Sequence, residues 1–195
     1  MAHLVKRLAI RSLTIALVWG ILLGLELLSP YQHARPARAQ VADPSKAAVI
    51  LNWYAARNHG DDDAAAALFA DNAFFVGAAL TGFCSVQSPC YDRASELRNL
   101  QTVAAATPNL CFTVTDIAVH GNIVTGRLEG RSDTNRRIGI EHTVATFLAE
   151  VQDSKIIAFV QRSDSGDPFT ALRDAINAGT AQAGAPIPTP NPVCG

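Results

Sequence analysis

Residues 58–75 read NHGDDDAAAALFADNAFF, and three consecutive aspartates beside a histidine resemble a metal or acid–base site. The aspartates, Asp61 to Asp63, follow a turn that ends at Gly60. The first can cap a helix, and the other two would occupy its first turn, where negative charge is favourable beside the helix dipole. A metal would need further ligands from elsewhere, because His59 alone is not enough. We therefore interpret the aspartates as the start of a helix.

The segments on both sides of this stretch predict two helices, a strand, a third helix and then four further strands. The helical spacing of apolar residues predicts helices, and the strand-like segments are joined by tight turns. The predicted helices cover residues 43–58, 61–69, 91–106 and, at the end, 167–178; the predicted strands cover 73–80, 110–120, 123–132, 138–151 and 155–164. This order predicts an α+β fold in which helices pack on one face of a curved antiparallel sheet.

The first 39 residues have the pattern of an export signal. A basic start precedes an uncharged apolar run of thirteen residues, Leu13 to Leu25, and the small residues Ala37 and Ala39 suit cleavage before Gln40. As a helix this run is about 20 Å long, shorter than the roughly 30 Å core of a bilayer. We favour a cleaved signal peptide over an uncleaved anchor formed by residues 12–28. The expected organisation is then a signal over 1–39, one domain over 43–178, and a flexible Pro/Gly/Ala-rich tail over 179–195.

The charge of the chain argues against polyanionic partners. Without residues 1–39 the chain has eleven Lys and Arg against sixteen Asp and Glu, a net charge of −5. Nucleic acid and anionic membrane surfaces are poor partners for such a charge. We expect contact with a membrane only if the N-terminal segment remains uncleaved.

The four cysteines indicate an oxidised loop rather than a metal site. Cys84 and Cys90 lie six residues apart in a loop-like segment, which predicts a local disulfide in an exported protein. A metal site would need histidines or further cysteines nearby, and this segment has none. Cys111 and Cys194 either form a second disulfide, or Cys111 is a small buried apolar residue.

Four phrases of the sequence resemble the nuclear-transport-factor-2-like superfamily, in particular its SnoaL-like branch. They are WYAARNHGDDDAAAALFADNAFFVG, YDRASELRNL, VHGNIVTGRLEG and FLAEVQDSKIIAFVQRSD. The resemblance spans about 120 residues, from Val49 to Asp164, and implies a cone: a strongly curved antiparallel sheet wrapped by three N-terminal helices around a deep apolar pocket. Because the family includes isomerases, cyclases, dehydratases, epoxide hydrolases and binding modules, fold membership does not decide the function.

The resemblance also identifies positions where catalytic residues would be expected. In the isomerases of this fold, a tyrosine and a protonated acid bind the enolate oxygen, and a carboxylate moves the proton. These positions fall on Trp53, on Thr146 or Phe147, and on Gly77. None of these residues can take the corresponding role, so we do not expect isomerase chemistry of that kind.

Glu141 and His142 are the remaining acid–base candidates. A strand over 138–151 would place Glu141 on the pocket face, as a general base or in a cross-strand ion pair with Arg127 or Arg131. We favour the ion pair. His142 is a candidate because histidine side chains commonly act as acid–base groups near neutral pH, but it would lie on the outer face, where a dimer contact or a surface position is the commoner role.

Five residues are expected to line the pocket: Trp53, Phe75, Gly77, Phe159 and Gln161. Aromatic residues at such spacing can equally form the core of the cone. The histidines have no metal-ligand spacing and no cofactor motif is present, so neither a metal nor a cofactor is expected.

These observations favour a non-catalytic binder of a small apolar molecule, or an assembly module, that forms a homodimer through the outer face of the sheet. The alternative is a lyase, isomerase or hydrolase that acts on a hydrophobic ligand in the pocket, with Glu141 and His142 as its acid–base groups.

Overall fold

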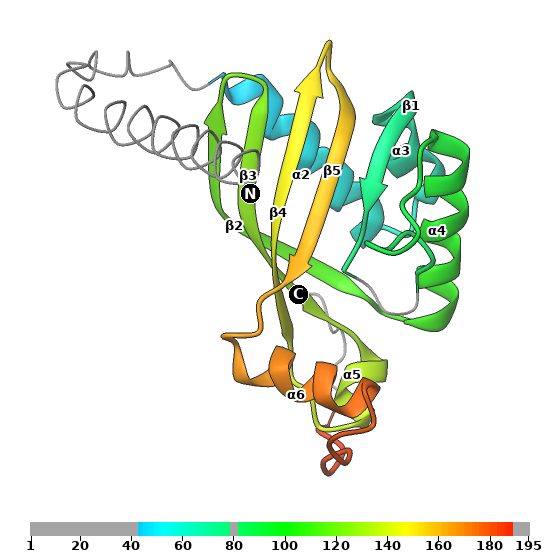
Figure 1. Ribbon diagram of the computed structural model, residues 1–195, viewed down its shortest axis with the longest axis vertical. Coiled ribbons are helices and arrows are strands. Elements are labelled where there is room, and N and C mark those ends of the chain that lie inside the picture. The colour runs from blue at the N-terminus through cyan, green and yellow to red at the C-terminus, as the bar shows by residue number, and fades with distance from the viewer. Residues whose placement is uncertain (1–42, 79–81, 189–195) are drawn as a thin grey trace, which may run out of the picture. The chain divides into compact units, whose positions relative to one another are not determined.

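The computed structural model describes residues 43–78 and 82–188, which belong to one compact unit (Figure 1). The predicted signal over 1–39, the alternative anchor over 12–28 and Cys194 lie outside the described residues. None of the helices described is long and apolar enough to cross a membrane.

Helices and a five-stranded sheet make up this unit, which confirms the α+β prediction. The helices are α2 (Pro44–Asn58), α3 (Asp62–Ala67), α4 (Arg93–Ala106), α5 (Asp133–Arg137) and α6 (Pro168–Asn177). The strands are β1 (Phe69–Val76), β2 (Cys111–His120), β3 (Ile123–Arg131), β4 (Thr143–Gln152) and β5 (Lys155–Ser163).

The sheet has the strand order β1-β5-β4-β3-β2. Strands β2 to β5 form the predicted antiparallel meander, whereas β1 pairs with β5 in parallel, so the sheet is mixed rather than wholly antiparallel. Helix α2 packs across β2 to β5, and α4 packs against α3 and β1. Helices α5 and α6 lie together at one end of the long strands (Figure 1).

Side-chain caps start the helices, as the sequence predicts. Asp43 accepts a hydrogen bond from the backbone N–H of Ser45 at 3.0 Å, and Asp61 accepts one from Ala64 at 2.9 Å. These bonds satisfy backbone donors that have no partner within the helix. Asp61 to Asp63 are therefore the start of α3, and within the described residues no group of three His, Cys, Asp or Glu could hold a metal ion.

Two predicted boundaries near β1 are wrong. The second helix ends at Ala67 rather than at residue 69, and the strand begins at Phe69 instead of residue 73. Phe69 pairs with Ile156 of β5, and the N–H of Ile156 donates to the carbonyl of Leu68 at 2.9 Å. Pairing with a strand that is distant in sequence thus outweighs the local helix preference.

The predicted strand over 138–151 begins only at Thr143, because the preceding residues belong to a different structure. Residues 133–137 form the short helix α5, capped by Ser132, where the sequence indicated a turn. Gly139 then adopts a φ of 80°, and the N–H of Ile140 donates to the carbonyl of Asn135 at 3.0 Å. The chain is thus not extended before β4, and Glu141 and His142 lie outside the strand.

Part of the predicted tail is bonded to this same region. The N–H of Gly184 donates to the carbonyl of Ile138 at 3.0 Å, and the N–H of Ile187 donates to that of Arg136 at 2.9 Å. Nη1 of Arg136 in turn donates to the carbonyl of Pro188 at 2.6 Å. Residues 184–188 are therefore held against α5.

Aromatic rings fill the centre of the core between α2 and the sheet. The Trp53 and Phe159 ring centroids are 4.6 Å apart, Phe75 and Phe159 are stacked at 5.3 Å, and Phe147 and Phe159 are stacked at 5.8 Å. Trp53 and Phe159 have no exposed surface. Such rings bury large apolar areas and favour these edge and offset contacts, so this cluster holds helix and sheet together.

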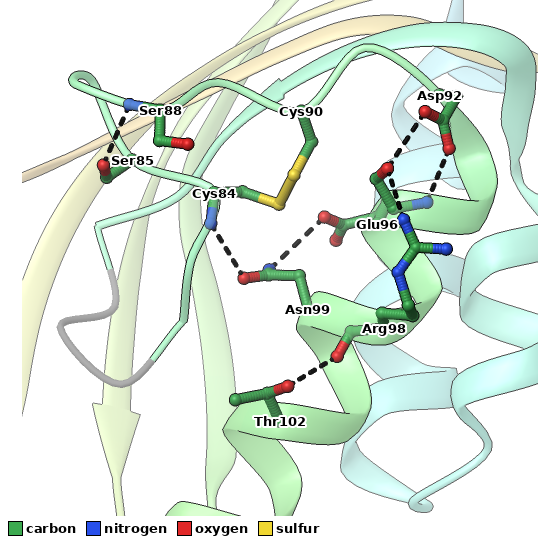
Figure 2. The surroundings of a disulfide bond; sticks show 10 residues. Cys84, Ser85, Ser88, Cys90, Asp92, Glu96, Arg98, Asn99 and Thr102 are labelled. Carbon is green, nitrogen blue, oxygen red and sulfur yellow. Dashed lines mark hydrogen bonds between the residues drawn. A yellow bond between two sulfur atoms is a disulfide. The ribbon is translucent and has the colours of Figure 1, made fainter.

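The predicted disulfide joins Cys84 to Cys90 in the loop between β1 and α4 (Figure 2). The backbone N–H of Cys84 donates to Oδ1 of Asn99 on α4 at 3.2 Å. The disulfide and this hydrogen bond together fix the loop against the helix. Cys111 is buried at the start of β2. Cys194 is not among the described residues, so the two alternatives for Cys111, a disulfide with Cys194 or a small buried apolar residue, both stand as predictions.

Candidate functional site

A cavity of about 160 Å³ lies between the helices and the end of the sheet that α5 and α6 cover. Its apolar walls include Val103, Leu110, Phe112, Leu128, Ile138 and Ala145. Its polar lining includes Arg57, Ser132, Thr134, Asn135, Thr143, Gln161, Ser163, Arg173 and Asn177. Side chains from distant parts of the sequence therefore meet at this place.

The residues expected to line the pocket are divided between this cavity and the packed core. Gln161 lines the cavity. Trp53, Phe75 and Phe159 instead pack on one another in the aromatic core, where each is at most 2% exposed.

Gly77 lies where the disulfide loop meets the end of β1. Its N–H donates to the carbonyl of Cys84 at 2.8 Å, and a Cβ placed on Gly77 would lie 3.2 Å from Cε1 of Phe75. The position at which the resemblance would place a catalytic carboxylate is thus crowded by the aromatic core and the disulfide loop.

Arg57, near the C-terminal end of α2, is one of two arginines among the described residues that line the cavity. Its guanidinium carbon lies 4.6 Å from the centroid of the Phe112 ring and 5.4 Å from that of Trp53. Such placement over aromatic rings is favourable for a cation. Burial lowers the pKa of the Arg57 guanidinium, although an arginine remains charged at neutral pH.

Arg57 also borders a second cavity of about 280 Å³, which is lined by the turn after α2, by α4 and by the start of β2. His59 and Asp62, from the stretch that first suggested a site, line this second cavity. Arg57, Thr107, Leu110 and Phe112 line both cavities, so they form the boundary between the two.

Glu96 is a buried carboxyl that sequence reasoning missed. It is 1% exposed, and its Oε2 accepts a hydrogen bond from Nδ2 of Asn99 at 3.3 Å (Figure 2). Its Oε1 has no hydrogen-bond partner within the described residues. Burial raises the pKa of Glu96 to about 8, although the nearby positive charge of Arg57 partly opposes this. Glu96 is therefore mostly protonated at neutral pH.

One signal in the sequence could have indicated this burial. Glu96 precedes the buried residues Leu100 and Val103 by four and seven positions, a spacing that places all three on one face of α4. Tyr54 is a second buried polar side chain near Arg57: burial raises the pKa of its hydroxyl, which has no hydrogen-bond partner in the described part of the chain.

The predicted ion pair of Glu141 with Arg127 or Arg131 is wrong. Arg127 instead pairs with Asp164 at 3.5 Å, and Arg131 pairs with Glu129 at 2.7 Å. Glu141 precedes β4 in an irregular segment and takes no part in the strand pairing of the described residues.

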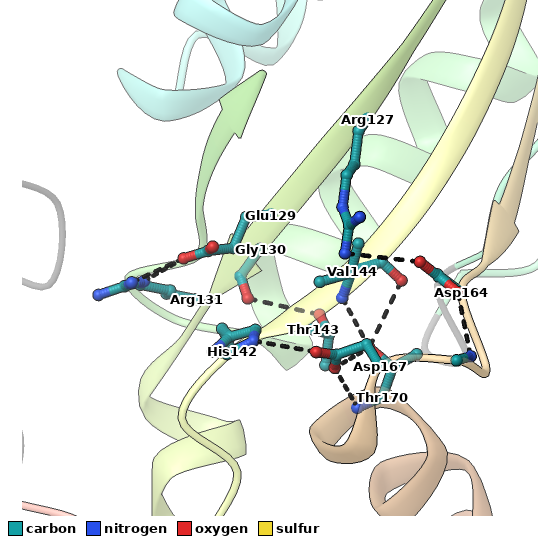
Figure 3. A network of polar contacts seen from close by, with 11 residues as sticks. Arg127, Glu129, Gly130, Arg131, His142, Thr143, Val144, Asp164, Asp167 and Thr170 are labelled. Carbon is teal, nitrogen blue, oxygen red and sulfur yellow. Dashed lines mark hydrogen bonds and ion pairs between the residues drawn. The ribbon is translucent and has the colours of Figure 1, made fainter. Parts of the chain in front are cut away.

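His142 belongs to a polar network that fixes α6 to the start of β4 (Figure 3). Its Nε2 lies 3.2 Å from Oδ2 of Asp167, the residue that caps α6, and its ring contacts that of Phe169. The backbone N–H of Val144 donates to Oγ1 of Thr170 at 2.7 Å, and this hydroxyl donates to Oδ1 of Asp167 at 2.8 Å. The histidine expected on an outer face therefore makes contacts within the domain.

This network positions one wall of the cavity, because α6 contributes Arg173 and Asn177 to the lining. The Arg173 guanidinium donates to Oγ of Ser163 at 3.0 Å and to Oδ1 of Asp174 at 2.8 Å. The second arginine of the cavity thus already has partners.

The lining supplies hydrogen-bond donors and apolar contacts rather than groups for proton transfer. Among the described residues that line the first cavity there is no Asp, Glu, His, Cys, Tyr or Lys. General acid–base catalysis needs a group that exchanges a proton near the working pH, and Ser, Thr, Asn, Gln and Arg do not meet that need unaided. The arrangement is suited to binding.

Solved structures with a similar fold come from several enzymes and enzyme candidates. IdmH of Streptomyces antibioticus, a candidate polyketide cyclase, is 24% identical, with 62% of this chain and 93% of that chain covered and a TM-score of 0.52. An epoxide hydrolase of M. tuberculosis, described as LEH-like, is 15% identical, with coverages of 69% and 94% and a TM-score of 0.50. At these identities the likeness shows the fold alone. No curated protein matches the sequence.

The family itself is shown by the sequence profile described as SnoaL-like domain, which matches residues 50–159. This range runs from the first helix to the last strand and covers more than half of the chain. The chain therefore belongs to the SnoaL-like family.

Proposed function

We propose that this chain binds a small, mainly apolar molecule in the first cavity and does not transform it. The observation that carries the proposal is the composition of the lining, which combines apolar walls with hydrogen-bond donors and has no proton-transfer group among its described residues. The volume of about 160 Å³ is close to the roughly 150 Å³ of an apolar cavity that binds benzene. A ligand with a single ring fits this size.

A cavity-filling variant tests this function. Ala145 lines the cavity, whereas Thr146, the next residue of β4, is exposed on the opposite face of the strand. Benzyl alcohol is the probe, and saturation-transfer NMR measures its binding. We expect the wild type and Thr146→Leu to bind it and Ala145→Leu to lose it. Binding that persists in Ala145→Leu, or no binding to the wild type, would contradict the proposal.

The second candidate function is an enzyme of the lyase, isomerase or hydrolase type. The observation that favours it is Glu96, a buried carboxyl with a raised pKa and a free Oε1 among the described residues. Glu96 does not line the first cavity, which is why we rank this function second. Glu141 and His142, the earlier acid–base candidates, do not line it either. Mass-spectrometric detection of a changed probe after incubation with the protein would reverse this ranking.

We propose further that the protein is exported and dimeric. The Cys84–Cys90 disulfide supports export, because disulfides persist mainly in oxidising compartments, and the pattern of residues 1–39 agrees with it. Leu148 of β4, 45% exposed, supports a contact through the outer face of the sheet. Two measurements on the protein recovered from the exported fraction test these proposals. The mass of the single chain reports whether residues 1–39 have been cleaved, and the sedimentation mass reports the number of chains.

A further inference from the structure

The guanidinium of Arg57 lies against aromatic rings and forms no ion pair within the part of the chain that the structure describes. It lies against the Trp53 and Phe112 rings, at 5.4 Å and 4.6 Å from their centroids. Among the described residues, its nitrogens make no hydrogen bond and no ion pair. The two rings thus fix the group, and its N–H donors remain available.

The two carboxyls near Arg57 do not form an ion pair with it. Glu96 is bonded to Asn99, and its burial favours the neutral acid, so it supplies no counter-charge at neutral pH. Asp62 lies on the wall of the second cavity without a direct pairing to the guanidinium. The first cavity has no acidic residue in the described part of its lining. A charge in this partly buried position is unfavourable until an anion joins it.

The other two arginines of this region, unlike Arg57, donate hydrogen bonds from their guanidinium groups. Arg173 also lines the first cavity but donates to Ser163 and Asp174. Arg136 is buried beside the cavity; its Nη1 donates to the carbonyl of Pro188, although its Nε has no hydrogen-bond partner among the described residues. Arg57 therefore differs from both, because among the described residues no nitrogen of its guanidinium has a hydrogen-bond partner.

A carboxylate has the geometry that Arg57 could accept. A planar guanidinium donates two parallel hydrogen bonds to the two oxygens of one carboxylate, and stacking on aromatic faces leaves the in-plane N–H groups free for this contact. Arg57 borders the first cavity, whose size suits a single ring, and it also borders the more polar second cavity. A ring in the first cavity would thus direct an acidic substituent to the boundary between the two.

We propose that Arg57 is an anion-binding residue and that the ligand is a small aromatic carboxylate, with its ring in the first cavity and its carboxylate on the Arg57 guanidinium. This inference rests on the proposed binding function and specifies its ligand class. It distinguishes this chain from a receptor for neutral apolar molecules, which would have no use for an unpaired arginine at the cavity wall.

The test compares benzoate with benzamide, which has nearly the same size and no charge, by titration calorimetry at pH 7. We expect the wild type to bind benzoate at least about tenfold more tightly, as charge-assisted bonds to a guanidinium imply. Arg57→Met is expected to lose this preference, and Arg57→Lys to keep it in weaker form, because a lysine retains the charge but not the planar fork.

The matched control is Arg98→Met, which removes the same charge from an exposed position on α4 outside both cavities and is expected to keep the preference. If the wild type binds benzamide as tightly as benzoate, the inference fails while the binding function stands. Preference for benzoate that persists in Arg57→Met also overturns it. If neither probe binds and benzyl alcohol does not bind either, the proposed function fails as well. Should Arg57→Met not fold, the comparison of Arg57→Lys with the wild type decides, because an unchanged benzoate affinity in that variant overturns the inference.

Discussion

Replacement of Glu96 by glutamine is expected to stabilise the protein in a way that depends on pH. The pKa of Glu96 rises from 4.5 in an ordinary environment to about 8 in the fold, because the carboxyl is buried. Between these values the folded protein retains a proton that the unfolded chain has lost. The free energy of unfolding therefore falls by about 1.4 kcal/mol for each pH unit in this range.

Summed over the whole shift, Glu96 costs the fold roughly 5 kcal/mol at pH 8 relative to pH 4, and roughly 3 kcal/mol at pH 7. Glutamine cannot ionise, and its amide can keep the contact that Asn99 makes with this side chain. The stability of Glu96→Gln minus that of the wild type should thus rise with pH between about 4.5 and 8 and then level off.

Urea unfolding followed by far-UV circular dichroism at pH 5, 6, 7 and 8 measures this difference. The control is Glu150→Gln, which removes a partly exposed carboxyl from β4, and its difference from the wild type should vary far less with pH. If the free energies of unfolding of Glu96→Gln and the wild type differ by the same amount at every pH from 5 to 8, the carboxyl does not retain its proton in the fold. That result would refute the reasoning from its burial.

Three further predictions concern other parts of the domain. Replacement of Cys84 and Cys90 by serine should lower the free energy of unfolding by about 2 kcal/mol, which is the entropic contribution expected for a short closed loop. Urea unfolding measures this difference. If a reductant lowers the free energy of unfolding of the wild type no more than that of the double variant, the prediction is contradicted. Thr170→Val removes the acceptor for the Val144 N–H and should cost about 1–3 kcal/mol, with faster amide exchange at Val144; unchanged exchange there would show that another group holds α6. Benzoate affinity should fall above about pH 8, because ionised Glu96 then adds a negative charge near the guanidinium of Arg57. Calorimetry from pH 6 to 9 should show a weaker fall in Glu96→Gln. If benzoate affinity depends on pH in the same way in both proteins, this coupling is contradicted.

The sequence alone determined the features that depend on neighbouring residues. The cap at Asp61, the turn at residues 121–122 and the antiparallel meander follow from local chemistry and from the alternation of side chains along strands. The disulfide between Cys84 and Cys90 follows from their short separation. These patterns, together with the resemblance, were sufficient for the fold class and the family.

Tertiary structure decided the features that depend on which surfaces meet. The parallel pairing with β5 placed Phe69 in a strand, because that pairing joins residues far apart in the sequence. Trp53 packs in the aromatic core instead of lining the cavity, and the packing of α4 against the rest of the domain buries Glu96. The lack of an ion-pair partner for Arg57 among residues 43–78 and 82–188 is also a result of the tertiary structure, because it depends on which groups the fold brings near the guanidinium. The sequence shows which charged residues are present, whereas the tertiary structure decides which of them have a partner of opposite charge.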